Sequence, residues 1–213
     1  MTKAFFLLLF IFRQISFFVP YSEKISFYDY KIENYSQSVQ VYREKNSVKI
    51  DIKYSFKKFP LISKGFLFLR VKNKDKIDEL VKNIYYSSDS YTGYVQNVLL
   101  FLRKNIKYDE EKQSQTPLDV LKRGSGYCTG FTALSYELLK RAGVKVRKVS
   151  GFFFYSKKNV LQRHSWIEVF FPSDGWYAID PVSGEFSDSY IYADIKENSI
   201  FLKDFTVSYA IEN

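Results

Sequence analysis

The spacing of apolar residues changes twice along this 213-residue chain, and each change limits the folds that the chain can adopt. From about residue 23 to 72, apolar and polar residues mostly alternate, which is the pattern of half-buried β-strands. Residues 76–142 instead repeat apolar positions three and four residues apart, as amphipathic helices do. Strand patterns return between residues 145 and 181. This order predicts an α+β fold with a small N-terminal β layer.

The first strand region is typical of an antiparallel β layer. SVQVYR (38–43) and SVKIDIKYSF (47–56) alternate apolar and polar residues, and residues 44–46 form a turn between them. GFLFLRV (65–71) predicts a further strand. None of these segments contains a residue pattern typical of a catalytic site.

Three helices are predicted in the first half of the helical region. KIDELVKNIYY (76–86) and YVQNVLLFLRKNI (94–106) are separated by the polar stretch SSDSYTG. TPLDVLKRG (116–124) predicts a short helix, with a proline at its first position. Thr116 would cap its start and Gly124 would end it.

A fourth helix is predicted immediately after Cys128, and strands follow it. Gly143 fits the left-handed residue that ends many helices. The apolar stripe of this helix consists of Phe131, Leu134, Leu138 and Ala142. Strands are predicted at residues 145–155, 163–171 and 175–181, with the turn PSDG between the last two. The tail from about residue 186 could add a strand or wrap around the domain.

The N-terminus resembles a secretory signal. Lys3 precedes the uncharged run AFFLLLFIF, and Arg13 ends it. Nine apolar residues are too few to span a bilayer as a helix, and no A-x-A cleavage site follows. A buried strand or the start of a buried helix would give the same pattern. We favour export, and we expect residues 1–20 to be a signal or anchor segment outside the folded domain, whether cleaved or retained.

The composition excludes several classes of site. One cysteine and one histidine rule out an internal disulfide and the usual Cys/His zinc sites. The sequence contains no phosphate-binding glycine motif and no EF-hand loop, so we expect no cofactor and no metal. The formal charge of +9 comes from Lys and Arg spread along the whole chain, which is typical of a compositional bias. We therefore expect no nucleic-acid partner, and membrane contact only through the N-terminal segment.

The single cysteine lies where a nucleophile would be useful. RGSGYCTGFTAL (123–134) places Cys128 among three glycines, at the start of a predicted helix. The free N–H groups and the positive dipole end of a helix N-terminus favour a thiolate. The glycines would let the backbone approach a substrate closely, and the Cys128 N–H could donate to an oxyanion. A nucleophilic thiol also needs a base and a group that orients the base, for which His164 and Asp180 are available.

The number of residues between His164 and Asp180 limits how the two can face each other if their strands pair as a hairpin. A turn of odd length centred near Pro172 would place the two residues directly opposite each other. A four-residue loop at 172–175 would displace them by three positions, so the pairing requires an asymmetric or bulged turn. Taken singly, a lone cysteine, histidine or Asp-Pro most often has a structural role.

Several motifs in order resemble the transglutaminase-like superfamily, whose members use Cys, His and Asp in that order. The motifs are RGSGYCTGFTALSYELLKRAGVKVRKVSGF, then HSWIEVFF, then GWYAIDP, and TPLDVLKRG and NIKYD resemble the lead-in of bacterial members. The resemblance covers about residues 94 to 184. It implies a papain-like core in which the nucleophile helix packs on an antiparallel sheet.

The resemblance also implies roles for individual residues. Cys128 is the nucleophile, His164 the acid/base and Asp180 the residue that orients the imidazole. The structural supports implied around the His and Asp strands are Trp166, Glu168 and Trp176.

One departure from the family pattern concerns the oxyanion. Animal transglutaminases have a tryptophan upstream of the cysteine, whereas both tryptophans of this chain lie downstream of it. Tyr108 is the nearest polar substitute for the oxyanion role. This departure weakens the case for protein crosslinking and leaves amide hydrolysis at least as well supported.

These observations predict the following organisation. Residues 1–20 form the signal or anchor segment, 21–75 the β-rich layer, 76–195 the transglutaminase-like catalytic domain and 196–213 a C-terminal tail. The expected activity is thiol-dependent acyl transfer or hydrolysis at an amide of a protein or peptide, with a cell-envelope component as a candidate substrate. Two alternatives stay open: a non-catalytic binding module on the same fold, and an exported basic protein that binds polyanions or a membrane surface.

Overall fold

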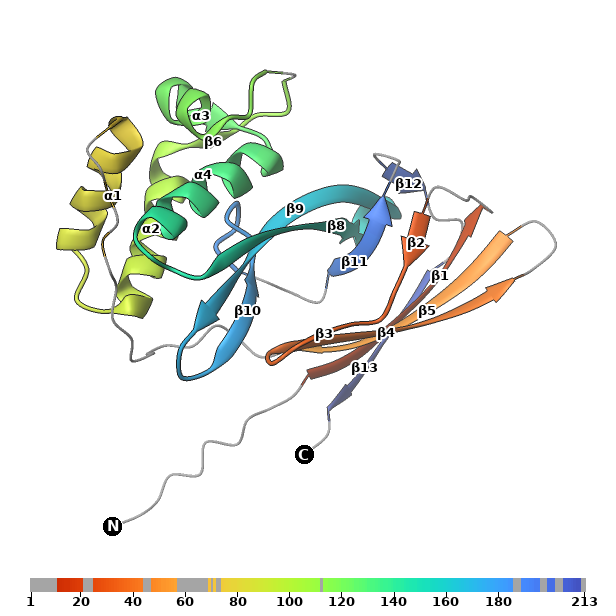
Figure 1. Ribbon diagram of the computed structural model, residues 1–213. Helices are drawn as coiled ribbons and strands as arrows, with labels where there is room; N and C mark the ends of the chain where they lie inside the picture. The colour runs from red at the N-terminus through yellow and green to blue at the C-terminus, as the bar shows by residue number, and fades with distance from the viewer. Residues whose placement is uncertain are drawn as a thin grey trace, which may run out of the picture.

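The chain forms three layers. The computed structural model describes residues 11–20, 25–43, 47–56, 69, 71, 74–111, 113–185, 189–195, 199–201 and 205–211. A group of helices covers one face of a six-stranded sheet, and a five-stranded sheet lies beyond the other face (Figure 1). The predicted α+β class and the N-terminal β layer are confirmed, and the helix that begins at Cys128 packs on an antiparallel sheet as expected.

Side-chain caps and left-handed glycines set the ends of the helices. The helices are α1 (Lys76–Tyr86), α2 (Tyr91–Asn105), α3 (Pro117–Arg123) and α4 (Cys128–Arg141). The side chains of Asp75, Ser90 and Thr116 accept backbone N–H groups at the starts of the first three. Because Ser90 is a cap, α2 begins three residues earlier than the sequence pattern indicated. Gly124 (φ 71°) and Gly143 (φ 84°) adopt the left-handed conformation that the sequence predicted.

The six-stranded sheet carries the segments with the family motifs. Its strands are β10 (Gly175–Ile179), β9 (Val160–Phe171), β8 (Val146–Tyr155), β11 (Tyr190–Ile195) and β2 (Ile25–Phe27) in spatial order, with β12 (Ser199–Phe201) also paired to β9. A short 3₁₀ helix, Ser156–Lys158, follows β8. The helices bury one face of this sheet in a core that includes Val98, Leu134, Leu138, Ile167 and Val169. The two-residue strands β6 (Lys107–Tyr108) and β7 (Ser125–Gly126) pair in parallel just before α4.

The five-stranded sheet is built from both ends of the chain. Its strands are β13 (Phe205–Ile211), β1 (Ile11–Pro20), β5 (Ser47–Phe56), β4 (Tyr35–Arg43) and β3 (Tyr30–Ile32) in spatial order, all antiparallel. The strands predicted at 38–43 and 47–56 are therefore present, and the C-terminal tail does add strands. The core between the two sheets includes Ile15, Phe17, Ile52, Phe152, Trp166 and Tyr192.

The expectation that residues 1–20 lie outside the folded domain is wrong for β1, which lies between β13 and β5. Ile15 and Phe17 are 0% exposed, whereas the neighbouring polar residues Gln14 and Ser16 are only partly buried. This period-two alternation is typical of a half-buried strand. It is difficult to recognise in the sequence because the start of the strand overlaps the apolar run of the N-terminus. Residues 1–10, which hold most of that run, lie outside the described residues.

The predicted boundaries at residues 75 and 195 also need correction. β2, from the N-terminal layer, pairs with β11 in the six-stranded sheet, while β13, from the tail, pairs with β1. At each of these two predicted boundaries, a strand on one side therefore pairs with a strand on the other side. The strand predicted at 65–71 falls outside the described residues except for Leu69 and Val71, which are not in a strand and pack partly buried against the helical core.

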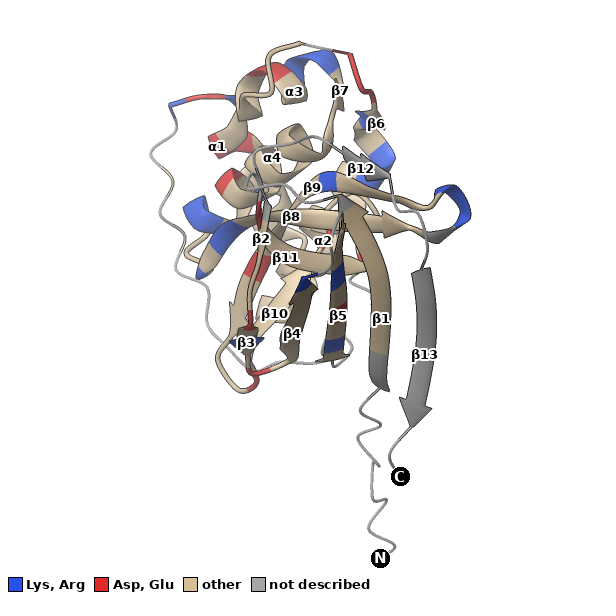
Figure 2. Cartoon of the chain, turned by 90° about the vertical axis from the view of Figure 1, so that its right-hand side faces the viewer, with Lys and Arg blue, Asp and Glu red and all other residues tan. Residues whose placement is uncertain are grey.

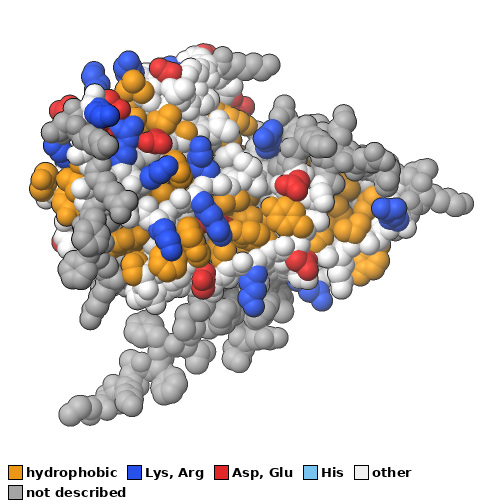
Figure 3. All heavy atoms as spheres, viewed as in Figure 1, with side chains coloured by type: hydrophobic (Ala, Val, Ile, Leu, Met, Phe, Trp, Pro, Cys, Tyr) orange, Lys and Arg blue, Asp and Glu red, His pale blue; other side chains and the backbone are white. Residues whose placement is uncertain are grey.

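The charged residues are dispersed over the described part of the chain. Lys and Arg occur on helices and strands alike, with Asp and Glu among them (Figure 2). On the face shown in Figure 3, basic side chains are scattered among acidic and apolar ones. This distribution agrees with a compositional origin of the positive charge. No helix within the described ranges is long and apolar enough to cross a membrane.

Candidate active site

Cys128 is the first residue of α4, as the sequence predicted. Its N-cap residue, Tyr127, makes no side-chain capping hydrogen bond, so the first N–H groups of the helix are not covered by a cap. Cys128 is 2% exposed and lines a cleft of about 500 Å³. A buried thiol at the positive end of a helix, facing a cleft, fits a nucleophile better than a residue sealed in a core.

His164 lies on β9 and connects Cys128 to Asp180. Its Nε2 lies 3.0 Å from Asp180 Oδ2, which leaves Nδ1 as the ring nitrogen available to the thiol. Burial lowers the pKa of His164, whereas the hydrogen bonds and charges of Asp180 and Cys128 raise it, and the balance lies at about 9. The imidazole is therefore protonated at neutral pH and can donate from both nitrogens.

The hairpin places Asp180 beside His164, but the two residues are neither directly opposite each other nor displaced by three positions. β9 and β10 are joined by a three-residue turn, 172–174, and Ile179 pairs with Ile167. Asp180 follows directly after β10, on the same side as His164 but two positions away along the strand. A diagonal pair at this separation is within reach of a long imidazole side chain.

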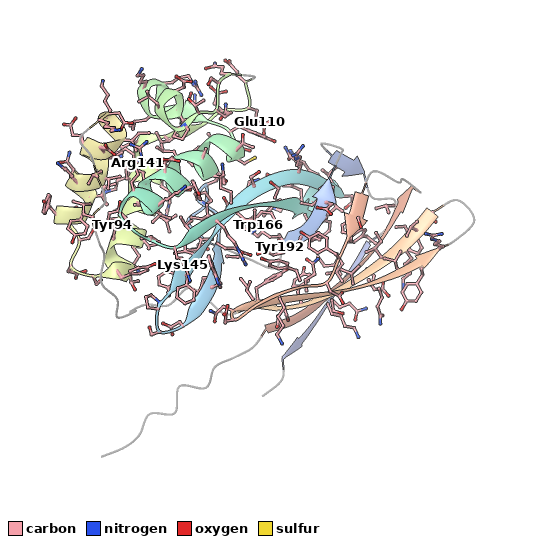
Figure 4. The ribbon with its side chains drawn as sticks, in the orientation of Figure 1. Tyr94, Glu110, Arg141, Lys145, Trp166 and Tyr192 are labelled. Atoms are coloured by element: carbon pink, nitrogen blue, oxygen red, sulfur yellow. The ribbon has the colours of Figure 1, made fainter. Side chains whose placement is uncertain are left out.

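Most residues that line the cleft in front of Cys128 carry polar or charged groups. It is lined by Glu110, Glu111, Gln113, Gln115, Tyr127, Cys128, Thr129, Gln162, Arg163 and Ser165. Glu110 lies in the loop beside the start of α4 (Figure 4). Gln162 donates from Nε2 to the Tyr127 hydroxyl at 3.1 Å, which joins β9 to the start of α4 across the cleft. Among the described residues, no group of three or more His, Cys, Asp and Glu side chains is arranged to hold a metal ion.

The family motifs and the three residues Cys128, His164 and Asp180 lie in one segment of the chain. The sequence model of the transglutaminase-like superfamily matches residues 78–181, which contain Cys128, His164 and Asp180. This segment belongs to the transglutaminase-like superfamily. The resemblance indicated by the sequence is thus confirmed, and we refer to residues 78–181 as the superfamily segment.

Further comparisons find one similar sequence and several similar solved structures. YebA of Bacillus subtilis, an uncharacterized protein, is 28% identical over 127 residues, and the match covers 53% of this chain but only 16% of YebA. A proposed cysteine protease from Cytophaga hutchinsonii has 12% identity and a TM-score of 0.48, covering 96% of this chain and 91% of its own. The periplasmic domain of TgpA from Pseudomonas aeruginosa has 13% identity and a TM-score of 0.47, covering 82% and 90%.

The residues expected to support the superfamily segment lie on the far side of its sheet from α4. Trp166 is 0% exposed and points into the space between the two sheets, as does Tyr192 (Figure 4). Glu168 is also 0% exposed and accepts hydrogen bonds from Tyr192 at 2.6 Å and from Arg147. The ring of Trp176 stacks with the guanidinium of Arg147, whose carbon lies 4.4 Å from the ring centroid.

Tyr108, the candidate oxyanion donor, packs against two aromatic rings at the start of α4. Its ring centroid is 5.5 Å from that of Tyr127 and 6.2 Å from that of Phe131. Burial raises the pKa of Tyr108, and the charge of Cys128 raises it further, so the hydroxyl stays protonated at neutral pH. Its oxyanion role stays a prediction.

Two of the glycines around Cys128, Gly126 and Gly130, pack closely against the side chain of Gln115. Its Oε1 accepts the Tyr127 backbone N–H at 2.9 Å, just before the nucleophile. A Cβ added to Gly130 would lie 2.2 Å from this oxygen, and one added to Gly126 would lie 3.2 Å from it. The glycines therefore make room for a side chain that fixes the start of α4. Sequence reasoning missed Gln115, because nothing in its local pattern distinguishes it from other loop residues.

Tyr190 is a second residue that the sequence did not indicate. It lies on β11, beyond the superfamily segment, and its hydroxyl donates to Asp180 Oδ2 at 2.5 Å. The only signal available was the alternation in YIYADI (190–195), which predicts a strand but no contact with Asp180.

Proposed function

We propose that this chain is a thiol-dependent enzyme that acts on amide bonds, with Cys128 as nucleophile, His164 as acid/base and Asp180 as the residue that orients the imidazole. The observation that supports this most is the connected set of groups around His164, whose Nε2 lies 3.0 Å from the Asp180 carboxylate and whose imidazole also hydrogen-bonds Cys128 at the start of α4. A fold used only for binding would not require this alignment.

The proposed reaction begins with attack of the Cys128 thiolate on an amide carbonyl in the cleft. The backbone N–H of Cys128 donates to the oxyanion that forms on the carbonyl oxygen. His164, which is protonated at neutral pH, transfers a proton to the leaving nitrogen, so that the C–N bond breaks and a thioester remains. Asp180 holds the imidazole in the orientation that this transfer needs.

Resolution of the thioester determines the class of enzyme. In hydrolysis, water attacks the thioester carbonyl, His164 accepts a proton from the water, and the thiol is released with a carboxylic acid. In transamidation, an amine attacks instead. Because the cleft is lined mainly by polar side chains, we propose that water enters it and that hydrolysis of a protein or peptide amide is the basal reaction. A component of the cell envelope is a candidate substrate.

The two alternatives make different predictions. A binding module would retain its ligand when Cys128 is alkylated or replaced, and a surface binder of polyanions would lose affinity steeply as salt is added. Hydrolysis of a peptide amide library by the wild-type chain, with Cys128→Ala as the control, separates these from the enzyme. Retention of full activity by Cys128→Ala would contradict the thiol mechanism.

Export is a separate proposal, based on Lys3 and the apolar run that follows it. The last two residues of this apolar run, Ile11 and Phe12, already belong to β1. Cleavage that preserves the fold would therefore have to occur before Ile11. Identification of the first residue of the protein recovered from the cell envelope tests both points.

A further inference from the structure

One oxygen of Asp180 accepts hydrogen bonds from two distant parts of the chain. Oδ2 accepts from His164 Nε2 at 3.0 Å and from the Tyr190 hydroxyl at 2.5 Å, while Oδ1 accepts from the backbone N–H of Val182 at 2.9 Å. Asp180 and Tyr190 are each 3% exposed, so water has little access to these bonds. The carboxylate is thus oriented by three donors: His164 lies within the superfamily segment, Val182 follows directly after its end, and Tyr190 comes from β11 beyond it.

Tyr190 also contacts the imidazole through its ring. The centroids of the Tyr190 and His164 rings are 5.7 Å apart. Burial raises the pKa of Tyr190, and the charge of Asp180 raises it further, so the hydroxyl remains a donor at neutral pH. The other titratable groups that act on this pair are Cys128 from α4 and Tyr155 from β8.

The five-stranded sheet holds β11 in place. The side-chain amide of Gln37, on β4, accepts the backbone N–H of Tyr192 at 2.9 Å and donates to its carbonyl at 2.8 Å. Tyr35, also on β4, donates from its hydroxyl to the Tyr190 carbonyl at 3.3 Å. Because Gln37 is only 3% exposed, this double hydrogen bond is protected from water and fixes the position of β11 along the sheet.

We propose that Tyr190 is a positioning residue for the Asp180–His164 pair and that the five-stranded sheet sets its place through Gln37. This inference rests on the proposed function, since it assigns a role in the same site. Tyr190 acts through Asp180: its hydroxyl fixes Oδ2 and shares that oxygen with the imidazole.

Loss of the Tyr190 hydroxyl has a defined electrostatic consequence. Among the described residues, His164 would then be the only side chain that donates to Asp180 Oδ2. The carboxylate charge, no longer shared with a second donor, would attract the imidazolium more strongly and raise the pKa of His164. A hydrogen bond to a charged group is large enough to shift this pKa upward by roughly half a unit to one unit. A tyrosine that only fills space would produce no such shift.

The chain contains a single histidine, so the His164 ring gives one unambiguous signal in an NMR pH titration. The test compares the full-length wild type with Tyr190→Phe, which keeps the ring and its packing. The matched control is Tyr192→Phe, on the same strand, which also loses a buried hydroxyl bonded to a carboxylate, but that of Glu168. Thermal unfolding of both variants measures the loss of stability that they share.

The expected result is a His164 pKa that is higher in Tyr190→Phe than in the wild type and unchanged in Tyr192→Phe. An unchanged or lowered pKa in Tyr190→Phe, or an equal shift in both variants, would overturn the proposal. The titration needs no substrate turnover. If the proposed enzymatic function failed, the shift would still be observed, and a missing shift would overturn the positioning role even in an active enzyme.

Discussion

The superfamily segment and the five-stranded sheet differ in what their sequences reveal. The superfamily segment holds Cys128, His164 and Asp180 in ordered motifs, and its helices and strands were predictable from spacing. The five-stranded sheet holds none of these residues, combines both ends of the described chain and was only partly predicted. Yet its β4 fixes the strand that donates a hydrogen bond to Asp180.

The comparison indicates that the motifs and the surrounding sheet make different contributions to the site. The motifs supply reactive groups on neighbouring elements, whereas the sheet fixes the geometry of one of them from outside the family match. If this division holds, loss of a strand from the five-stranded sheet should unfold the domain, whereas changes to the reactive groups of the superfamily segment should remove activity and keep the fold.

The largest effect is expected from removal of β1. Deletion of residues 1–20 would leave β5 and β13 without the strand that pairs between them and would remove three buried side chains, Ile15, Phe17 and Val19. Burial of each such side chain is worth about 1.5–3 kcal/mol, and a domain of this kind is stable by only about 5–15 kcal/mol. We expect the deletion to abolish cooperative thermal unfolding measured by circular dichroism.

Deletion of residues 1–10 alone is the matched control, because it keeps every residue of β1. We expect that shorter deletion to retain a cooperative transition. A chain that lacks residues 1–20 and still unfolds at the wild-type temperature would show that β1 is dispensable.

The next largest effect concerns the reactive groups of the superfamily segment. Cys128→Ala should abolish thioester chemistry, because the sequence contains no other thiol, and His164→Ala should cost nearly as much. Asp180→Asn should keep the fold but lower the rate by up to about 10⁴, through the wrong imidazole tautomer. Hydrolysis rates on a peptide amide library, with thermal unfolding as the control for folding, measure each effect.

The pKa of His164 predicts a pH dependence of stability. The folded-state pKa of about 9 lies above the reference value of about 6.5, so protonated His164 stabilises the fold fully below pH 6.5, and this contribution disappears as pH rises through 9. The free energy of unfolding of the wild type should therefore exceed that of His164→Gln by more at pH 6 than at pH 10. A difference that stays constant between these pH values would contradict the ion pair with Asp180.

The smallest effect concerns the fit of Gln115 between the glycines. Gly130→Ala would place a methyl group against Gln115 Oε1 and should lower the free energy of unfolding by about 1–3 kcal/mol. Replacing Gln115 with alanine in addition would remove that oxygen and should restore part of the loss. Chemical denaturation of the single and double variants measures this coupling. Equal stability of Gly130→Ala and the wild type would show that Gln115 is not confined by the glycine.

Local patterns explain what could be predicted from the sequence. The caps and glycines around α3 and α4 act within a few residues, so Thr116, Gly124 and Gly143 were readable directly. The same holds for Cys128 at a helix start. Asp180 was predicted from a motif, but the register that places it diagonal to His164 depends on the length of a turn that spacing alone left open.

The rest depends on contacts between residues far apart in the chain. Apolar runs of strands and of signal segments have similar composition, so hydropathy could not distinguish β1 from a leader. The partners of β1 lie at opposite ends of the sequence, in β5 and β13. The contact between Tyr190 and Asp180 joins a motif to a strand that carries no family signature.

The reactivity of Cys128 tests the central claim most directly. Because the chain contains one cysteine, intact mass measured during treatment with iodoacetamide reports on this thiol alone. We expect one adduct per chain and a labelling rate at pH 7 that falls at least roughly tenfold in His164→Ala, because this variant lacks the imidazole that activates the thiol. Equal labelling rates in the folded wild type and the folded variant would contradict the central claim.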